Sequence, residues 1–128
     1  MGYDRTVRLD RDFAGTVTAV RDALAAQGFG VLTEIDVAAT LGAKLGQEME
    51  DYVILGACNP SLAHQALEAD RTVGLLLPCN VVVRAEGEGT VVQALDPGTM
   101  VTLTGLSALA PVAAEATRRL DAALVALT

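Results

Sequence analysis

The chain has 128 residues, of which 52% are hydrophobic, and it carries 16 acidic side chains against 9 basic ones, for a formal net charge of -7. This length fits one domain with its own core, and the acidic balance argues against a nucleic acid partner, because phosphate binding relies on gathered Lys and Arg. No apolar run reaches the roughly 18 residues of a membrane-spanning helix, and the charged first residues do not resemble a secretory signal, so we expect one soluble, cytoplasmic domain over residues 1–128 with no membrane partner.

The first half of the chain predicts strands alternating with helices. Residues 3–9 alternate well enough for a half-exposed strand, and residues 12–27 carry apolar side chains at three- and four-residue steps, as a helix on a sheet does. Asp12 is placed to cap this helix and Gly28 to end it. We further expect a strand over 30–37, one or two weak helical turns over 38–45, a buried strand over 51–58 and a helix over 60–69.

The second half predicts mostly consecutive strands and one closing helix. We expect a strand over 73–84 that Pro78 interrupts, a return strand over 90–95, a short strand over 100–104 and a helix over 108–127. This order indicates an α+β fold, a two-layer sandwich in which helices pack on one face of a largely antiparallel sheet.

Both cysteines stand in matching local sequences. Each thiol is followed directly by an asparagine, as Cys58-Asn59 and Cys79-Asn80, and each pair has a proline beside it. Core packing asks only for size and apolarity, so a repeated context of this kind marks the four residues as the best candidate site. The alternative is that both cysteines are small buried apolar residues, since free Cys is among the most buried residue types.

The two thiols are predicted to differ in reactivity. Cys58 lies just before the expected helix over 60–69, whose N-terminus favours a thiolate, so we expect it to react faster than Cys79. Asn59 and Asn80 each offer an amide that can orient a thiolate, an oxyanion or a water, and each can instead cap backbone groups.

A metal ion is one possible ligand for this pair. Thiolates suit soft ions such as Cu(I) or Zn(II), but a closed zinc site wants four ligands, and one chain offers only Cys58, Cys79 and the single His64. A reducing cytoplasm argues against a permanent disulfide, and no Cys-x-x-Cys motif signals thioredoxin chemistry. The residues therefore identify neither the metal nor any other cofactor.

Three ordered motifs carry a family resemblance. They are Lys44-Leu45-Gly46, the run Leu55-Gly56-Ala57-Cys58-Asn59-Pro60, and Leu75-Leu76-Leu77-Pro78-Cys79-Asn80-Val81-Val82-Val83. Together they resemble the DUF302 family over nearly the whole chain, which implies a similar β-α-β-rich-α arrangement in a domain of unknown function. Lys44, the only lysine, is a candidate contact for an anionic ligand and equally a surface charge.

Three functions remain open from the sequence. The first, which we favour, is a binding or sensing module with a Cys58/Cys79 pocket for a soft metal or a small ligand. The second is an enzyme of thiol chemistry with Cys58 as nucleophile and Asn80 as oxyanion donor, although no paired general base is evident. The third is an interaction protein whose cysteines are inert.

A homodimer is also expected. A sheet with helices on one side leaves its second face uncovered, and a contiguous apolar patch usually marks an interface. The strand residues that we expect to supply apolar area on that face are Leu76, Val82, Val53 and Leu55.

Overall fold

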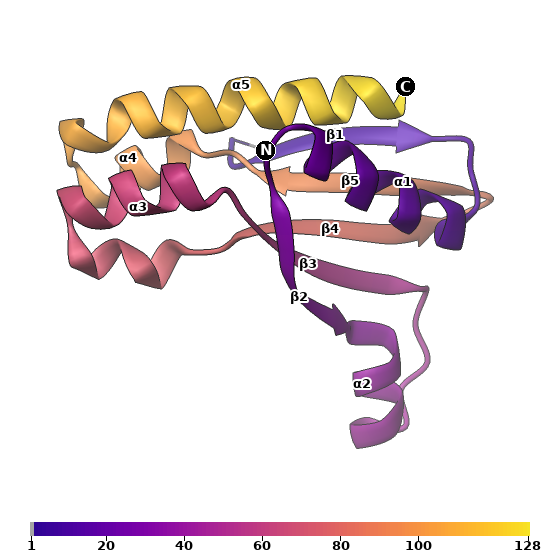
Figure 1. Ribbon diagram of the computed structural model, residues 1–128. Helices are drawn as coiled ribbons and strands as arrows, with labels where there is room; N and C mark the ends of the chain where they lie inside the picture. The colour runs from indigo at the N-terminus through magenta and orange to yellow at the C-terminus, as the bar shows by residue number, and fades with distance from the viewer. Residues whose placement is uncertain (1) are drawn as a thin grey trace.

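The computed structural model describes residues 2–128, which form one five-stranded sheet with helices packed against it (Figure 1). All neighbouring strands are antiparallel, and their spatial order is β1-β5-β4-β3-β2. The predicted α+β sandwich is thus confirmed. The strands are β1 (Asp4–Leu9), β2 (Gly30–Asp36), β3 (Tyr52–Cys58), β4 (Cys79–Glu86) and β5 (Gly89–Leu95). The helices are α1 (Phe13–Ala26), α2 (Val37–Leu45), α3 (Pro60–Ala69), α4 (Gly98–Thr104) and α5 (Ala110–Leu127), with 3-10 turns η1 (Arg71–Leu76) and η2 (Ser107–Leu109).

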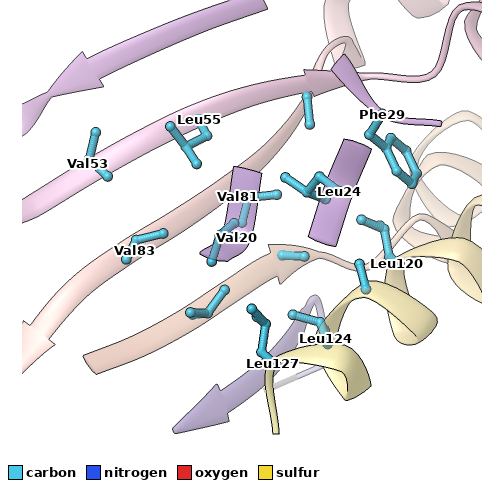
Figure 2. Packing of buried hydrophobic residues seen from close by; sticks show 14 of the residues in the cluster. Val20, Leu24, Phe29, Val53, Leu55, Val81, Val83, Leu120, Leu124 and Leu127 are labelled. Carbon is cyan, nitrogen blue, oxygen red and sulfur yellow. The ribbon is translucent and has the colours of Figure 1, made fainter. Parts of the chain in front are cut away.

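The long helices α1 and α5 pack side by side over the sheet (Figure 1). Asp12 caps α1 as predicted, since its carboxylate accepts a hydrogen bond from the backbone N–H of Gly15 at 3.0 Å. Leu24 of α1 and Leu120 of α5 meet Val81 of β4 in the main core (Figure 2). No helix within residues 2–128 has both the length and the hydropathy that crossing a bilayer requires.

A second apolar cluster lies beneath α3, α4 and the first turns of α5. It is smaller than the main core and borders the end of β3, where Cys58 is the last residue. Its buried members are Leu62, Ala66, Val73, Met100, Leu109, Val112 and Ala116.

The predicted strand over 100–104 is wrong, because Gly98–Thr104 forms the helix α4. The β-branched residues in this stretch favour a strand locally, but Met100 gains burial in the second cluster, and tertiary packing overrides a weak local preference. The hydroxyls of Thr102 and Thr104 donate to the carbonyls of Gly98 and Met100, so these side chains bond back along the helix.

The predicted strand over 73–84 is wrong in its first part. Arg71–Leu76 is a 3-10 turn, and β4 begins only at Cys79, after Pro78. The Asp70 carboxylate accepts a hydrogen bond from the N–H of Thr72 at 3.0 Å and so starts the turn, while Val73 is buried in the second cluster. Pro78, which lacks an N–H for the ladder, therefore precedes the strand instead of bending it.

The face of the sheet opposite the core differs from the expected one. Side chains alternate along a strand, so Val53 and Leu55 point toward α1 and α5, where they are 5% and 0% exposed. Their placement on an uncovered face is therefore wrong, and Leu76 packs against the second cluster instead. Only Val82 of the four expected residues has the phase of the uncovered face, which it shares with Ile54.

Candidate functional site

Both cysteines line one small apolar cavity at the end of β3. The cavity has a volume of about 30 Å³ and lies against α3, α4 and α5. Its wall also includes Asn59, Phe29 and Met100, so that Cys58, Cys79 and Met100 all line it. The structure thus brings three sulfur-containing residues to the lining of a single cavity.

A close contact between β3 and the chain before β4 fixes this region. A Cβ built on Gly56 would overlap the hydroxyl oxygen of Thr33 and lie 2.9 Å from Cγ of Pro78, so only glycine fits here. Gly56 therefore lets Pro78 approach β3, and Cys79 follows directly as the first residue of β4. This contact explains in packing terms why a glycine and a proline stand near the two cysteines.

Cys58 lies immediately before the N-terminus of α3, as predicted. Asn59 is the N-cap of α3, and its Oδ1 accepts a hydrogen bond from the backbone N–H of Leu62 at 3.2 Å. Pro60 occupies the first turn, where its missing N–H costs nothing. Asn59 is 7% exposed, and its side-chain oxygen is already bonded to the helix backbone, so its primary role is to cap α3.

Burial affects the acidity of the Cys79 thiol. It is paired with Ala57 across the ladder and has the strand phase of the buried Val81. Burial raises the pKa of the Cys79 thiol, and the nearby Cys58 raises this pKa further. A raised pKa keeps this sulfur protonated at neutral pH, so an ion that binds it must displace the proton.

The two thiols do not form a bond with each other. Both cysteines are free and half-buried, and their sulfurs are not in contact. Cys58 has the phase of Ile54, on the face opposite Val81, although it is the last residue of its strand and still lines the cavity. Cys79 therefore has the strand phase of the core, and Cys58 has that of the opposite face.

Three other candidate residues lie away from this cavity. Asn80 is exposed and lines a much larger hollow on the uncovered sheet face. Lys44 is exposed near the end of α2, which follows the Asp36 end of β2, whereas Cys58 pairs with Gly30 at the other end. His64 is 75% exposed, and its Nε2 lies 3.6 Å from a carboxylate oxygen of Glu68 on the same helix.

The side chains around the cavity do not provide the ligands of a closed zinc site. Within residues 2–128, no three side chains of the types His, Cys, Asp and Glu come together in a way that could hold a metal ion. A closed four-ligand zinc site in one chain is therefore not supported by the described residues. Met100 adds a thioether sulfur to the two cysteines, and a thioether is a further kind of ligand for a soft ion.

Met100 is the residue of the cavity that sequence reasoning missed. The sequence predicts a short strand over 100–104, whereas Met100 lies in the helix α4. The signal was present, because Pro is common where helices begin, and the Asp96 carboxylate accepts a hydrogen bond from the N–H of Gly98 at 2.9 Å. If the helix begins at Gly98, after Pro97, Met100 lies in its first turn.

Comparisons with known proteins agree with this architecture. A family model described as "Domain of unknown function DUF302" matches residues 5–127. The chain is similar to a solved structure titled "Crystal structure of uncharacterized conserved protein DUF302 from Bacillus stearothermophilus", with 31% identity, a TM-score of 0.93 and 100% of both chains covered. No match was found among curated proteins.

Proposed function

Since the chain belongs to the DUF302 family, whose description assigns no function, we propose from its own residues that it binds a soft monovalent metal ion, Cu(I), in the cavity that Cys58, Cys79 and Met100 line. The observation that carries this proposal is the shared lining of one cavity by Cys58, Cys79 and Met100. Copper would be held by sulfur alone, and the domain would serve to bind or sense it.

The size of the cavity favours an ion over an organic ligand. Pockets for small organic molecules have volumes of roughly 300–1,000 Å³, whereas one water needs about 10–15 Å³ of the same kind of volume. A cavity of about 30 Å³ accepts a ligand of one or two atoms. A metabolite would require α3 or α4 to move away from the sheet.

The chemistry of the lining favours a soft ion over a hard one. Thiolate and thioether sulfur select Cu(I), whereas carboxylate and carbonyl oxygen suit Mg²⁺ and Ca²⁺. The cavity wall is mainly aliphatic, from Leu62, Ala66 and Val112 among others, and carries no carboxylate. Such a wall also excludes the water that would compete for the ion.

The thiol enzyme is less well supported by the same residues. Asn80, its expected oxyanion donor, lines a different hollow from the cysteines. The raised pKa of Cys79 is the opposite of the lowered pKa that activates a thiol nucleophile.

An anaerobic titration with Cu(I) in competition with a chromophoric Cu(I) chelator tests the proposal. We expect one Cu(I) per chain. The affinity should fall more than about tenfold in Cys79→Ser, since the loss of even a residue that only hydrogen-bonds to a metal ligand typically weakens binding by that factor. Met100→Leu keeps the volume and removes the sulfur, so it should weaken binding as well. The matched control is Met49→Leu, which changes a methionine outside the cavity and should leave the affinity unchanged.

Two results would overturn the proposal. One is Cu(I) affinity that does not change in either Cys58→Ser or Cys79→Ser while the proteins remain folded by circular dichroism. The other is Zn(II) that displaces Cu(I) at equal concentration, because a sulfur-only site of this size should prefer the softer ion.

A further inference from the structure

One wall of the cavity at the end of β3 belongs to a segment that buries little of itself. We call residues 71–77 the strap: it consists of η1 and Leu77 and connects α3 to β4. Leu77 lines the cavity. Four of the six residues of η1 are exposed, among them Leu75 at 85%, and Val73 is the buried one. Figure 1 shows the strap beside α3, at the end of the molecule where α5 begins.

The backbone hydrogen bonds of the strap are also weak. The N–H of Val73 donates to the carbonyl of Asp70 at 3.1 Å, and the N–H of Leu77 donates to the carbonyl of Gly74 at 3.2 Å. Such bonds between residues three apart have poorer geometry than those of an α-helix. Segments with few buried apolar side chains and exposed backbone hydrogen bonds open locally at a lower cost in free energy than unfolding of the whole domain.

Both ends of the strap are fixed to the body of the protein. At its start, the N–H of Asp70 donates to the carbonyl of Ala66 in α3 at 3.0 Å. At its end, Pro78 packs closely on Gly56 of β3, where a Cβ would lie 2.9 Å from Cγ of the proline. The residues between these two points can therefore move outward while α3 and β4 stay in place.

The other walls of the cavity are held more firmly. Asn59 caps α3, and β3 lies within the sheet between β2 and β4. The helix α4, which carries Met100, is held at its start by Asp96, whose carboxylate accepts hydrogen bonds from Gly98 at 2.9 Å and from Arg5 at 3.2 Å. The long helix α5 packs along α1. Opening the cavity therefore costs least at the strap.

We propose that the strap is the gate of the cavity: it moves away from the second cluster, uncovers the space behind Leu77, admits the ion and closes over it. This inference rests on the proposed function, because it names the route by which Cu(I) reaches that site. Leu76 and Leu77 are partly buried against the second cluster, so closure returns apolar surface to it. The closed strap keeps water away from the bound ion.

Hydrogen exchange of single backbone amides, followed by NMR on the metal-free wild type, tests the motion directly. After correction for intrinsic rates, the amides of Val73 and Leu77 should exchange at least about tenfold faster than that of Ala63, which donates to the carbonyl of Asn59 at 2.9 Å in the capped helix α3. A Leu77 amide as slow as that of Ala63 would show that the strap stays closed, and this would overturn the proposal.

Val73→Ala weakens the anchor of the strap. Its amides should exchange faster still, and in stopped-flow experiments Cu(I) carried by a chromophoric chelator should enter and leave at least about threefold faster, because buried methyl groups are lost. Both rates depend on the population of the open strap, so the affinity should change little. Val92→Ala is the matched control, since Val92 of β5 is 0% exposed and Val73 is 1% exposed, and this variant should leave the Cu(I) rates unchanged.

Gly74→Ala should act in the opposite direction. A Cβ on Gly74 would lie 3.9 Å from Cδ2 of Leu67, which is an ordinary contact, and alanine restricts the backbone of the open strap. Exchange of the strap amides and both Cu(I) rates should therefore slow. Gly42→Ala in α2 is the control, because its Cβ would likewise meet one atom, the carbonyl oxygen of Gln47 at 3.8 Å, far from the strap in sequence.

The outcomes separate the strap from the proposed function. Cu(I) rates that follow the exchange of the strap amides in the wild type and in both variants support the gate. Cu(I) binding at rates that neither Val73→Ala nor Gly74→Ala changes means another entrance, which overturns the gate and leaves the proposed function standing. A strap that exchanges as expected in a chain that binds no Cu(I) overturns the proposed function, and the gate with it. Circular dichroism on each variant checks that the protein remains folded.

Discussion

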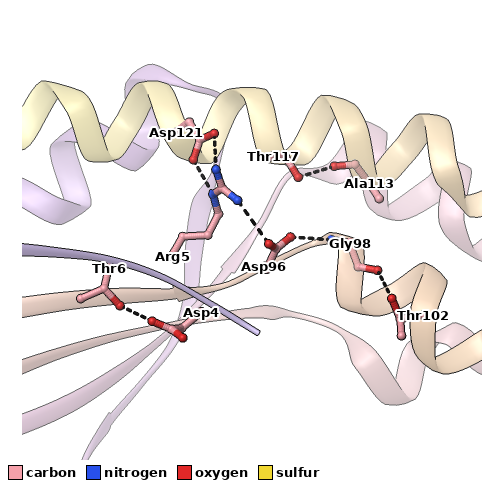
Figure 3. Close-up of polar contacts among 9 residues, drawn as sticks. All are labelled: Asp4, Arg5, Thr6, Asp96, Gly98, Thr102, Ala113, Thr117 and Asp121. Carbon is pink, nitrogen blue, oxygen red and sulfur yellow. Dashed lines mark hydrogen bonds and ion pairs between the residues drawn. The ribbon is translucent and has the colours of Figure 1, made fainter. Parts of the chain in front are cut away.

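Arg5 donates two hydrogen bonds to Asp121, from Nε to Oδ1 at 2.5 Å and from Nη2 to Oδ2 at 2.7 Å (Figure 3). The contact ties β1, at the start of the chain, to α5, at its end. Arg5 also donates from Nη1 to Oδ2 of Asp96 at 3.2 Å, and the other oxygen of Asp96 accepts from Gly98 at the start of α4. One guanidinium thus joins the sheet edge to two helices, and its pKa is raised, chiefly by Asp121.

Replacing Arg5 with lysine should destabilise the fold by about 1 kcal/mol, because lysine keeps the charge but cannot make the paired hydrogen bonds. The side chains of Arg5 and Asp121 are 31% and 41% exposed, so solvent screening holds the loss near that of a surface pair. Urea unfolding measures the change. Arg118→Lys is the control, and a loss as large in that exposed pair would contradict a special role for Arg5.

Gly56→Ala should destabilise the protein by roughly 1–3 kcal/mol, because the added methyl group overlaps Thr33 and the Pro78 ring and forces backbone to shift. The displacement should reach Cys79, so Cu(I) affinity is expected to fall as well. Gly30→Ala, where a methyl group meets nothing within 4 Å, is the matched control on the neighbouring strand. Equal stability of the two variants would show that the close approach of Pro78 does not constrain the site.

Most of the fold could be predicted from the sequence where local and tertiary signals agree. The helix over 60–69 is predictable because its cap, Asn59, its first-turn Pro60 and its apolar spacing all indicate the same element. The helix over 98–104 is not predictable in this way, because Val101, Thr102 and Thr104 are β-branched and favour a strand. The burial of Met100 in the second cluster depends on contacts that no local pattern contains.

The candidate site was predictable only in part, for the same reason. The matching sequences around Cys58 and Cys79 identified two of its residues, and both line one cavity. The separation of Lys44 and Asn80 from that cavity follows from the strand order and from the phase of β4, which depend on register. Register is fixed by pairing between distant segments, and spacing within one segment does not reveal it.

Cys79 should react more slowly with an alkylating reagent than Cys58. Burial raises the pKa of Cys79, which leaves little of the reactive thiolate near neutral pH. Rates measured on Cys58→Ser, which retains Cys79, and on Cys79→Ser, which retains Cys58, give the comparison directly. Both variants should react alike in denaturant, and a native Cys79 that reacts as fast as Cys58 would contradict the enclosed position of its sulfur.

Glu115 should make folding stability sensitive to acid. Hydrogen bonds from Arg118 and Arg119 lower its pKa from 4.5 to about 2. A lowered pKa in the folded state contributes stability that is present above the unfolded value and is lost as pH falls from about 4.5 through about 2.

The difference in thermal midpoint between the wild type and Glu115→Gln should therefore shrink over that interval and stay constant above it. Glu88→Gln, on the turn between β4 and β5, serves as the control, because no ion pair of Glu88 is described within residues 2–128. The pH dependence of its difference from the wild type should be weaker. A constant difference for Glu115→Gln across the whole interval would show that the two arginines do not hold this carboxylate in solution as they do in the structure.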